Sequence, residues 1–127
     1  MRRMQVIATP HAPTPAGHYS QAFVHAGVVY VAGQLPMKPG EAPDPSRPVA
    51  EQVAIAFANV AAILRAAGSD LDRVLSVTLY VVDIARWGEV NAAYARAFGE
   101  HRPARTTVPV PALHHGFAVE VQVVAAV

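Results

Sequence analysis

The segment RPARTTVPVPALHHGFAVEVQVVAAV, residues 102–127, carries the most information about the fold. Its runs Ala104–Val110 and Phe117–Ala126 are rich in β-branched residues, and the short stretch ALHHG lies between them. This pattern predicts two β-strands joined as a hairpin. Both strands are almost wholly apolar, yet the first contains Arg105 and the second contains Glu120. These two opposite charges need an explanation.

Alternation along extended backbone places each charge on a polar face of its strand. Arg105 shares a face with Thr107 and Pro109, whereas Glu120 shares a face with Gln122. One interpretation is a solvated sheet face on which Arg105 and Glu120 form an exposed cross-strand ion pair of little energetic value. Composition alone favours this interpretation, but a solvated face would carry more than one charge per strand.

The other interpretation is a cleft with few and opposed polar groups. The planar guanidinium of Arg105 can hold a carboxylate through two parallel hydrogen bonds. A nearby glutamate such as Glu120 can orient or deprotonate a water molecule. Together the two residues would suit a small carboxylate substrate that is attacked by water.

Upstream of this segment the sequence predicts two amphipathic helices. The first spans Val49–Ala67, and Gly68 follows it at the position of a C-terminal cap. The second lies in ARWGEVNAAYARAFG, residues 85–99. Apolar residues recur at helical spacing in both, namely Val53, Phe57, Val60 and Leu64 in the first and Trp87, Val90, Tyr94 and Phe98 in the second.

Further strands complete the predicted architecture. They are expected at Met4–Ala8, at Gln21–His25 and Val28–Ala32 around a tight turn, and in DRVLSVTLYVVD, residues 72–83. The order is then strand, hairpin, helix, strand, helix, hairpin. This order predicts an α+β fold with both helices packed on one face of a mixed β-sheet, and a single domain over residues 1–127.

Composition limits the possible partners. Hydrophobic residues make up 53% of the 127 residues and charged residues 15%, which predicts that another copy covers part of the surface. The formal charge of +1, without a basic run beyond Arg2 and Arg3, argues against nucleic acid and against an anionic membrane. No cysteine is present, and no apolar run at the N-terminus is long enough for a signal peptide. We expect a soluble, cytoplasmic protein.

The six histidines do not predict a metal site. His114 and His115 are adjacent, so their side chains would point apart on extended backbone, and no His-x-x-x-His spacing occurs. The stretch VAGQLP contains Gly33 after a strand but no glycine-rich nucleotide loop, so Gly33 instead indicates a close approach of the backbone to another group.

Five motifs occur in order along the chain: GHYSQA, VAGQLP, NVAAILRAAG, VTLYVVDIARWGEVNAAYARAF and RPARTTVPVPAL followed by VEVQVVA. From about Gly17 to Ala125 the sequence resembles the reactive intermediate deaminases, the Rid (YjgF-like) family of small enamine/imine deaminases. This resemblance implies a chorismate-mutase-like fold and a homotrimer with three clefts between neighbouring subunits. It also implies hydrolysis of 2-iminopropanoate or 2-iminobutanoate to a 2-keto acid and ammonia, without a cofactor.

The resemblance also implies roles for particular residues. Arg105 of the Pro-Ala-Arg motif would bind the substrate carboxylate, and Glu120 would position the attacking water. Gly33 would offer its backbone to the substrate. Two further residues, Tyr19 and Asn91, would line or brace the cleft.

The chain departs from the family pattern at a few positions. His18 and His114 replace prolines, and Ala32 stands where many members have serine. Thr107 stands where many have cysteine, and it keeps a hydroxyl for substrate binding. Two alternatives to the leading function stay open: a non-catalytic trimer that binds small carboxylates or acts as a chaperone, and an enzyme for an aminoacrylate-type intermediate. The ribonuclease label of parts of the family is disfavoured by the near-neutral charge.

Overall fold

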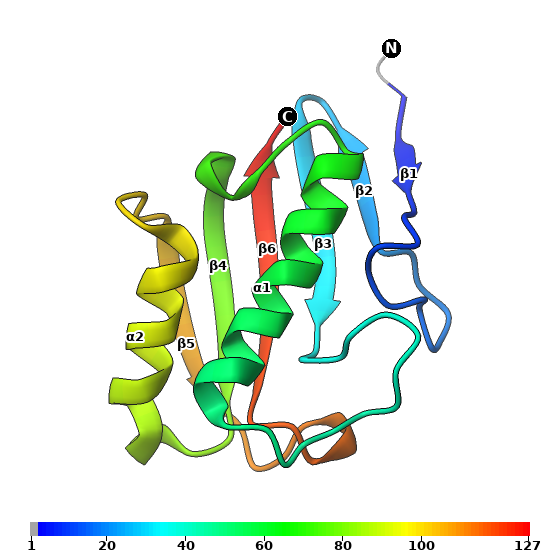
Figure 1. Cartoon of the computed structure of the whole chain (residues 1–127). Coiled ribbons are helices and arrows are strands. Elements are labelled where there is room, and N and C mark those ends of the chain that lie inside the picture. Colours follow the sequence, from blue (N-terminus) through cyan, green and yellow to red (C-terminus); the bar gives the residue numbers. More distant parts are fainter. Residues whose placement is uncertain (1–2) are drawn as a thin grey trace.

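The structure is a computed structural model, and it describes residues 3–127. Two α-helices, α1 (Val49–Ala66) and α2 (Trp87–Phe98), cover one face of a six-stranded sheet (Figure 1). The strands are β1 (Gln5–Ile7), β2 (Ala22–His25), β3 (Val28–Gln34), β4 (Val74–Val81), β5 (Ala104–Pro109) and β6 (Val119–Ala126). Short 3₁₀ turns η1 (Leu71–Arg73), η2 (Ile84–Arg86) and η3 (His114–Gly116) connect them. The predicted α+β architecture is confirmed.

The predicted C-terminal hairpin is wrong. The strand order is β1-β2-β3-β6-β4-β5, so β6 lies between β3 and β4 and does not pair with β5. β5 is an edge strand that pairs with β4 in parallel, whereas the other pairs are antiparallel. Pro109, the last residue of β5, has no N–H to donate to a ladder and therefore suits an edge strand. The side chains of β6 alternate between buried and less buried positions, as a central strand requires.

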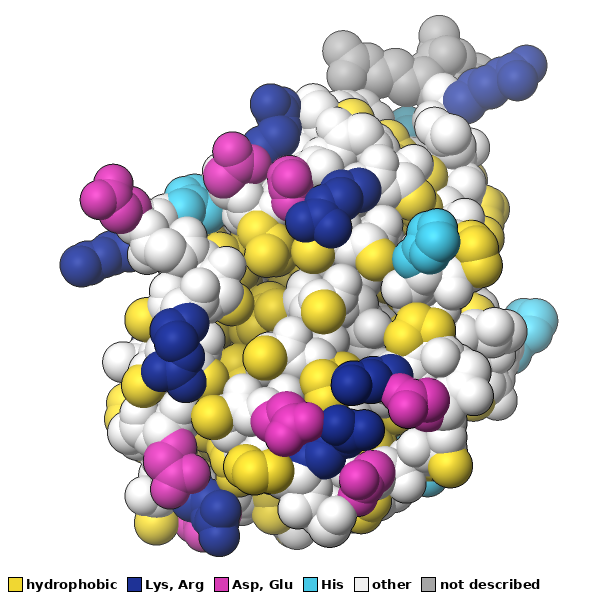
Figure 2. Space-filling view, in the orientation of Figure 1, with side chains coloured by type: hydrophobic (Ala, Val, Ile, Leu, Met, Phe, Trp, Pro, Cys, Tyr) yellow, Lys and Arg dark blue, Asp and Glu magenta, His cyan; other side chains and the backbone are white. Residues whose placement is uncertain are grey.

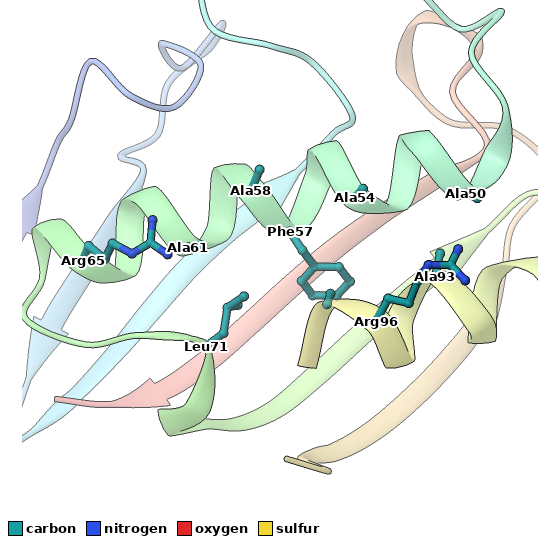
Figure 3. A pocket seen from close by; sticks show the side chains of 10 residues that line it. Ala50, Ala54, Phe57, Ala58, Ala61, Arg65, Leu71, Ala93 and Arg96 are labelled. Carbon is teal, nitrogen blue, oxygen red and sulfur yellow. The ribbon is translucent and has the colours of Figure 1, made fainter. Parts of the chain in front are cut away.

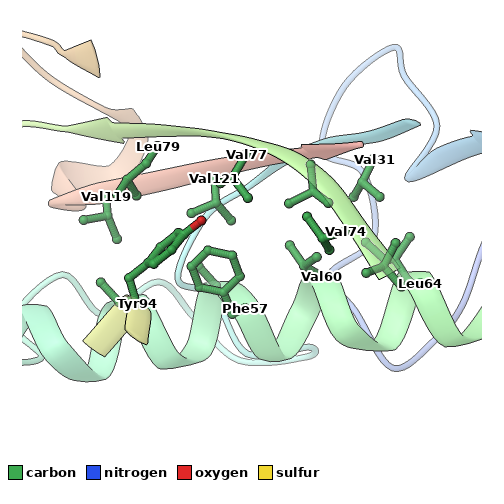
Figure 4. Close-up of a cluster of buried hydrophobic side chains, with 14 of the residues drawn as sticks. Val31, Phe57, Val60, Leu64, Val74, Val77, Leu79, Tyr94, Val119 and Val121 are labelled. Carbon is green, nitrogen blue, oxygen red and sulfur yellow. The ribbon is translucent and has the colours of Figure 1, made fainter. Parts of the chain in front are cut away.

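The core lies between the sheet and the two helices (Figure 4). The predicted stripe of α1 points into it, and its four members are at most 1% exposed. The ring of Phe57 meets the rings of Tyr94 and Phe98 from α2 at centroid distances of 5.4 and 5.1 Å, both edge to face. This burial also explains why α1 is apolar enough to pass for a membrane span, because 61% of that window is buried inside the protein.

No helix within residues 3–127 covers the opposite face of the sheet (Figure 1). Along β6, Val119, Val121 and Val123 are buried on the helix side, so Glu120 and Gln122 point to the open side. The same alternation along β3 places Tyr30 on the open side of the sheet. There Tyr30 is 51% exposed, and it lies beside Phe23 of the neighbouring strand β2. The open face therefore exposes the aromatic side chains of Phe23 and Tyr30.

Candidate functional site

A cavity with a volume of about 710 Å³ lies at one end of the sheet. It lies between the proline-rich loop before β2, the end of β3 with the loop after it, and the segment that joins β5 to β6. Its wall includes Tyr19, Gln21, Ala32, Gly33, Leu35, Met37, Leu113, His114, His115 and Glu120. The cavity therefore collects three of the predicted site residues, Tyr19, Gly33 and Glu120.

A bulge in β3 brings Gly33 against Glu120. Val31 pairs with Val123 and Gln34 with Val121, so β3 has one residue more than β6 over this interval. A Cβ atom on Gly33 would lie 2.5 Å from Oε2 of Glu120. The backbone of Gly33 does not need a positive φ angle. Glycine stands here because the carboxylate occupies the space that a side chain would take.

Glu120 is half-buried in this cavity. Burial raises the pKa of its carboxyl, and the nearby charge of His114 acts in the opposite direction. A carboxylate whose proton affinity is raised by partial desolvation is a better proton acceptor than an exposed one. The group is thus suited to take a proton from a water molecule in the cavity.

Two buried amides hold the walls of the cavity in place. Gln21 fastens the proline-rich loop: its Oε1 accepts from the Thr9 amide at 2.7 Å, and its Nε2 donates to the carbonyls of Thr9 and Pro13 at 3.1 and 3.0 Å. Asn59 of α1 donates to the carbonyl of Met37 at 2.7 Å. Sequence reasoning missed both residues. They could have been suspected, because backbone groups of a loop that forms no strand ladder need hydrogen-bond partners from side chains.

Arg105 lies elsewhere. Its pairing with Val77 turns its side chain toward the helix face of the sheet. There the guanidinium carbon lies 4.7 Å from the ring centroid of Trp87 and 4.6 Å from that of Tyr94, and Nη1 donates to Oδ1 of Asn91 at 3.0 Å. These three partners occupy one side of α2 because they are spaced at i, i+4 and i+7. They orient the guanidinium while leaving most of its N–H donors unused.

Within one chain the predicted site residues therefore form two groups. Arg105 and Asn91 lie at the β5 edge on the helix side, with Thr107 on the same face of β5. Glu120 lies in the cavity on the open side, and β4 separates its strand from β5. The interpretation of Arg105 and Glu120 as a cross-strand ion pair on one solvated face is wrong. The sequence could not reveal that Arg105 and Glu120 lie on opposite faces of the sheet. β5 and β6 are each paired with β4, so the faces of their side chains are related only through the two registers with β4.

A second hollow lies between α1 and α2 on the helix face (Figure 3). Alanines and the ring of Phe57 form most of its wall, and Arg65 and Arg96 lie at its margin. None of its ten lining residues is an acid or a histidine. Among all described residues, moreover, no group of three or more His, Cys, Asp or Glu side chains could hold a metal ion. The cavity beside Glu120 is therefore the better candidate for a catalytic site.

The chain is similar to known proteins over nearly its whole length. A family model described as "Endoribonuclease L-PSP" matches residues 9–127. The human protein named 2-iminobutanoate/2-iminopropanoate deaminase is 37% identical over 121 residues, which cover 95% of this chain and 88% of the human protein. The crystal structure of yeast Mmf1 superposes with a TM-score of 0.93 at 34% identity, covering 98% of each chain. That of E. coli TdcF with bound serine gives 0.89 at 30% identity, covering 97% of this chain and 98% of the other.

Proposed function

The chain belongs to the endoribonuclease L-PSP family, which includes the Rid proteins, and from this premise we propose that it hydrolyses small 2-imino acids to 2-keto acids and ammonia. The observation that carries the proposal is the half-buried carboxylate of Glu120, which faces a cavity opposite the bare backbone of Gly33. The relatives named 2-iminobutanoate/2-iminopropanoate deaminase support the reaction class. The cytoplasmic location stays a prediction.

In the proposed reaction, Glu120 takes a proton from water while the water oxygen attacks C2 of the imine. The π electrons of the C2=N bond move to nitrogen, which takes a proton from an acid or from solvent, and a carbinolamine forms. Protonated Glu120 then gives its proton to the amino group, the C2–N bond breaks and ammonia leaves, while the hydroxyl group loses its proton to solvent or to a base and becomes the carbonyl of the 2-keto acid. No redox change occurs, so the reaction needs neither an oxidant nor a reductant. Because the carbon is already electrophilic, positioning and general-base catalysis are sufficient.

In a single chain neither Arg nor Lys is among the lining residues of the cavity, so the cavity has no permanently charged cation to bind the substrate carboxylate. Arg105 is exposed and presents free guanidinium donors at the edge of the sheet. We propose that the open faces of the sheets pack together in a homotrimer, and that Arg105 of a second copy completes each cleft. The exposed rings of Phe23 and Tyr30 on the open face support this, because such apolar area favours burial.

The helix face does not favour the ribonuclease activity that the family name suggests. On this face Lys and Arg side chains are interspersed with Asp and Glu (Figure 2). Arg47, for example, pairs with Glu51 at 2.7 Å and with Asp44 at 3.8 Å. A polyanion would need a continuous basic stripe.

The proposed function is tested by turnover of imines made in solution. An amino-acid oxidase generates 2-iminopropanoate or 2-iminobutanoate, and semicarbazide traps the imine that persists. The protein is expected to lower the semicarbazone signal in proportion to its concentration, with keto acid and ammonia formed in equal amounts. An unchanged trap signal for every imino acid tried, together with ligand-induced stabilisation, would instead support the non-catalytic carboxylate-binding alternative.

Replacing Gly33 by alanine is expected to lower kcat about 100-fold with little loss of stability, because a misplacement of about 1 Å in a catalytic group has an effect of that size. The new Cβ would displace the Glu120 carboxylate, and this side-chain end can move without disturbing the core. Gly88→Ala is the matched control, since a Cβ there meets nothing within 4 Å. Equal kcat values for the two variants in the imine assay would refute the assigned role of Gly33.

A further inference from the structure

His114 lies in the same cavity as Glu120, on the short turn η3 just before β6. The turn is fixed at both ends by backbone bonds: the amide of Gly116 donates to Leu113 at 3.2 Å, and that of Phe117 donates to His114 at 3.3 Å. Phe117 is only 1% exposed and anchors the turn in the protein. The backbone of η3 is therefore held beside β6, and the side chains of His114 and Glu120 line the same cavity.

Few ionisable side chains surround His114 in the cavity. The ionisable side chains that line the cavity are Tyr19 from the loop before β2, His114 and His115 from η3, and Glu120 from β6. The ring centroids of His114 and His115 lie 4.8 Å apart. A positive charge on His114 favours the ionised form of Glu120 and partly offsets its burial. In the proposed trimer, Arg105 of a second copy adds a permanent cation to this environment.

We infer that His114 is a second proton-transfer residue of this site and acts on the nitrogen of the imine while Glu120 acts on water. The inference rests on the proposed deaminase activity. Glu120 accepts a proton when water adds to C2, and the departing π electrons leave a nitrogen that needs a proton. The imidazolium of His114 supplies it and becomes neutral.

The second half of the reaction restores both groups. Protonated Glu120 gives its proton to the amino group, so that the C2–N bond breaks and neutral ammonia leaves. The hydroxyl proton of the carbinolamine passes to the imidazole of His114 as the carbonyl forms. One water and one imine are consumed, and one keto acid and one ammonia are produced. Imidazole suits this exchange because it changes its charge near neutral pH.

The test compares pH profiles of kcat and kcat/KM for the full-length wild type, His114→Gln and His25→Gln. His25 is an exposed histidine at the end of β2, outside the cavity, and serves as the matched control. His114→Gln is expected to lower kcat about 100-fold, a typical value for one general acid. The acid limb of kcat/KM should also move to higher pH, because the pKa of Glu120 rises once its cationic neighbour is lost. KM should change little.

Rescue of activity by added imidazole provides a second measurement, which distinguishes the loss of a proton-transfer group from misfolding of the variant. The rate of His114→Ala should rise with added imidazole, whereas His25→Ala should not respond. Superimposable pH profiles of His114→Gln and His25→Gln would overturn the inference. A shifted acid limb with unchanged kcat would also overturn it, since His114 would then be only an electrostatic neighbour. An inactive wild type would instead refute the proposed function itself.

Discussion

Replacement of Arg105 by alanine is expected to lower kcat/KM about 10²- to 10⁴-fold, because two charge-assisted hydrogen bonds to a carboxylate contribute about 1.5–3 kcal/mol each. The fold should not suffer, since Arg105 is exposed at the β5 edge and contacts α2 through Trp87, Asn91 and Tyr94 on the surface of the protein. The measurement is steady-state kinetics of imine hydrolysis together with the melting temperature.

Arg105→Lys is the matched variant, because it keeps the positive charge and loses the planar fork. It should recover only part of the activity. A wild-type kcat/KM in Arg105→Ala would show that the substrate carboxylate is held elsewhere.

The same variant also tests where the cleft is formed. Arg105 and Glu120 lie on opposite faces of their own sheet, so a cleft that contains both must draw on two chains. Chains carrying Arg105→Ala and chains carrying Glu120→Gln, unfolded and refolded together, should regain activity because about a quarter of the clefts then contain both native residues. Recovery is not expected when each variant is refolded alone. No recovery in the mixture would refute the shared cleft.

The helices of this fold could be predicted from the sequence, whereas the order of the strands could not. The apolar spacing of α1 and the cap at Gly68 are local features, and both were confirmed. The placement of β6 between β3 and β4 depends on contacts across the whole chain. Pro109 and Pro111 indicated an edge strand, but the adjacent runs 104–110 and 117–126 equally suited a hairpin.

Part of the candidate site could also be predicted from the sequence, and part of it could not. Gly33 and Glu120 could be proposed from motifs, and the bulge in β3 brings them together as a close approach would require. The stacking of Arg105 between Trp87 and Tyr94 could not be predicted, because the strand alternation says nothing about which face of the sheet α2 covers. His114 was noticed as a departure from the family, but only the cavity places it with Glu120.

Glu120→Gln is expected to reduce turnover about 10²- to 10⁴-fold, the range of a lost general base, and to leave the spontaneous rate of imine hydrolysis as the floor. In the wild type, kcat/KM should fall with decreasing pH at a pH above the ordinary pKa of a glutamate, since burial raises the pKa of this carboxyl. The exposed Glu100→Gln is the matched control and should keep wild-type kinetics.

Although Glu120→Gln is expected to lower turnover, it should raise the stability of the fold at neutral pH. The pKa of Glu120 is higher in the folded chain than in the unfolded chain, so between these two values the folded state binds more protons. The free energy of unfolding of the wild type therefore decreases as pH rises through this window, and Glu120→Gln removes the decrease. At pH 7 the variant should melt at a higher temperature than the wild type, and the difference should shrink as the pH falls below the window. A lower melting temperature for Glu120→Gln than for Glu100→Gln at pH 7 would mean that the carboxylate stabilises the fold, and its desolvation could not then explain its basicity.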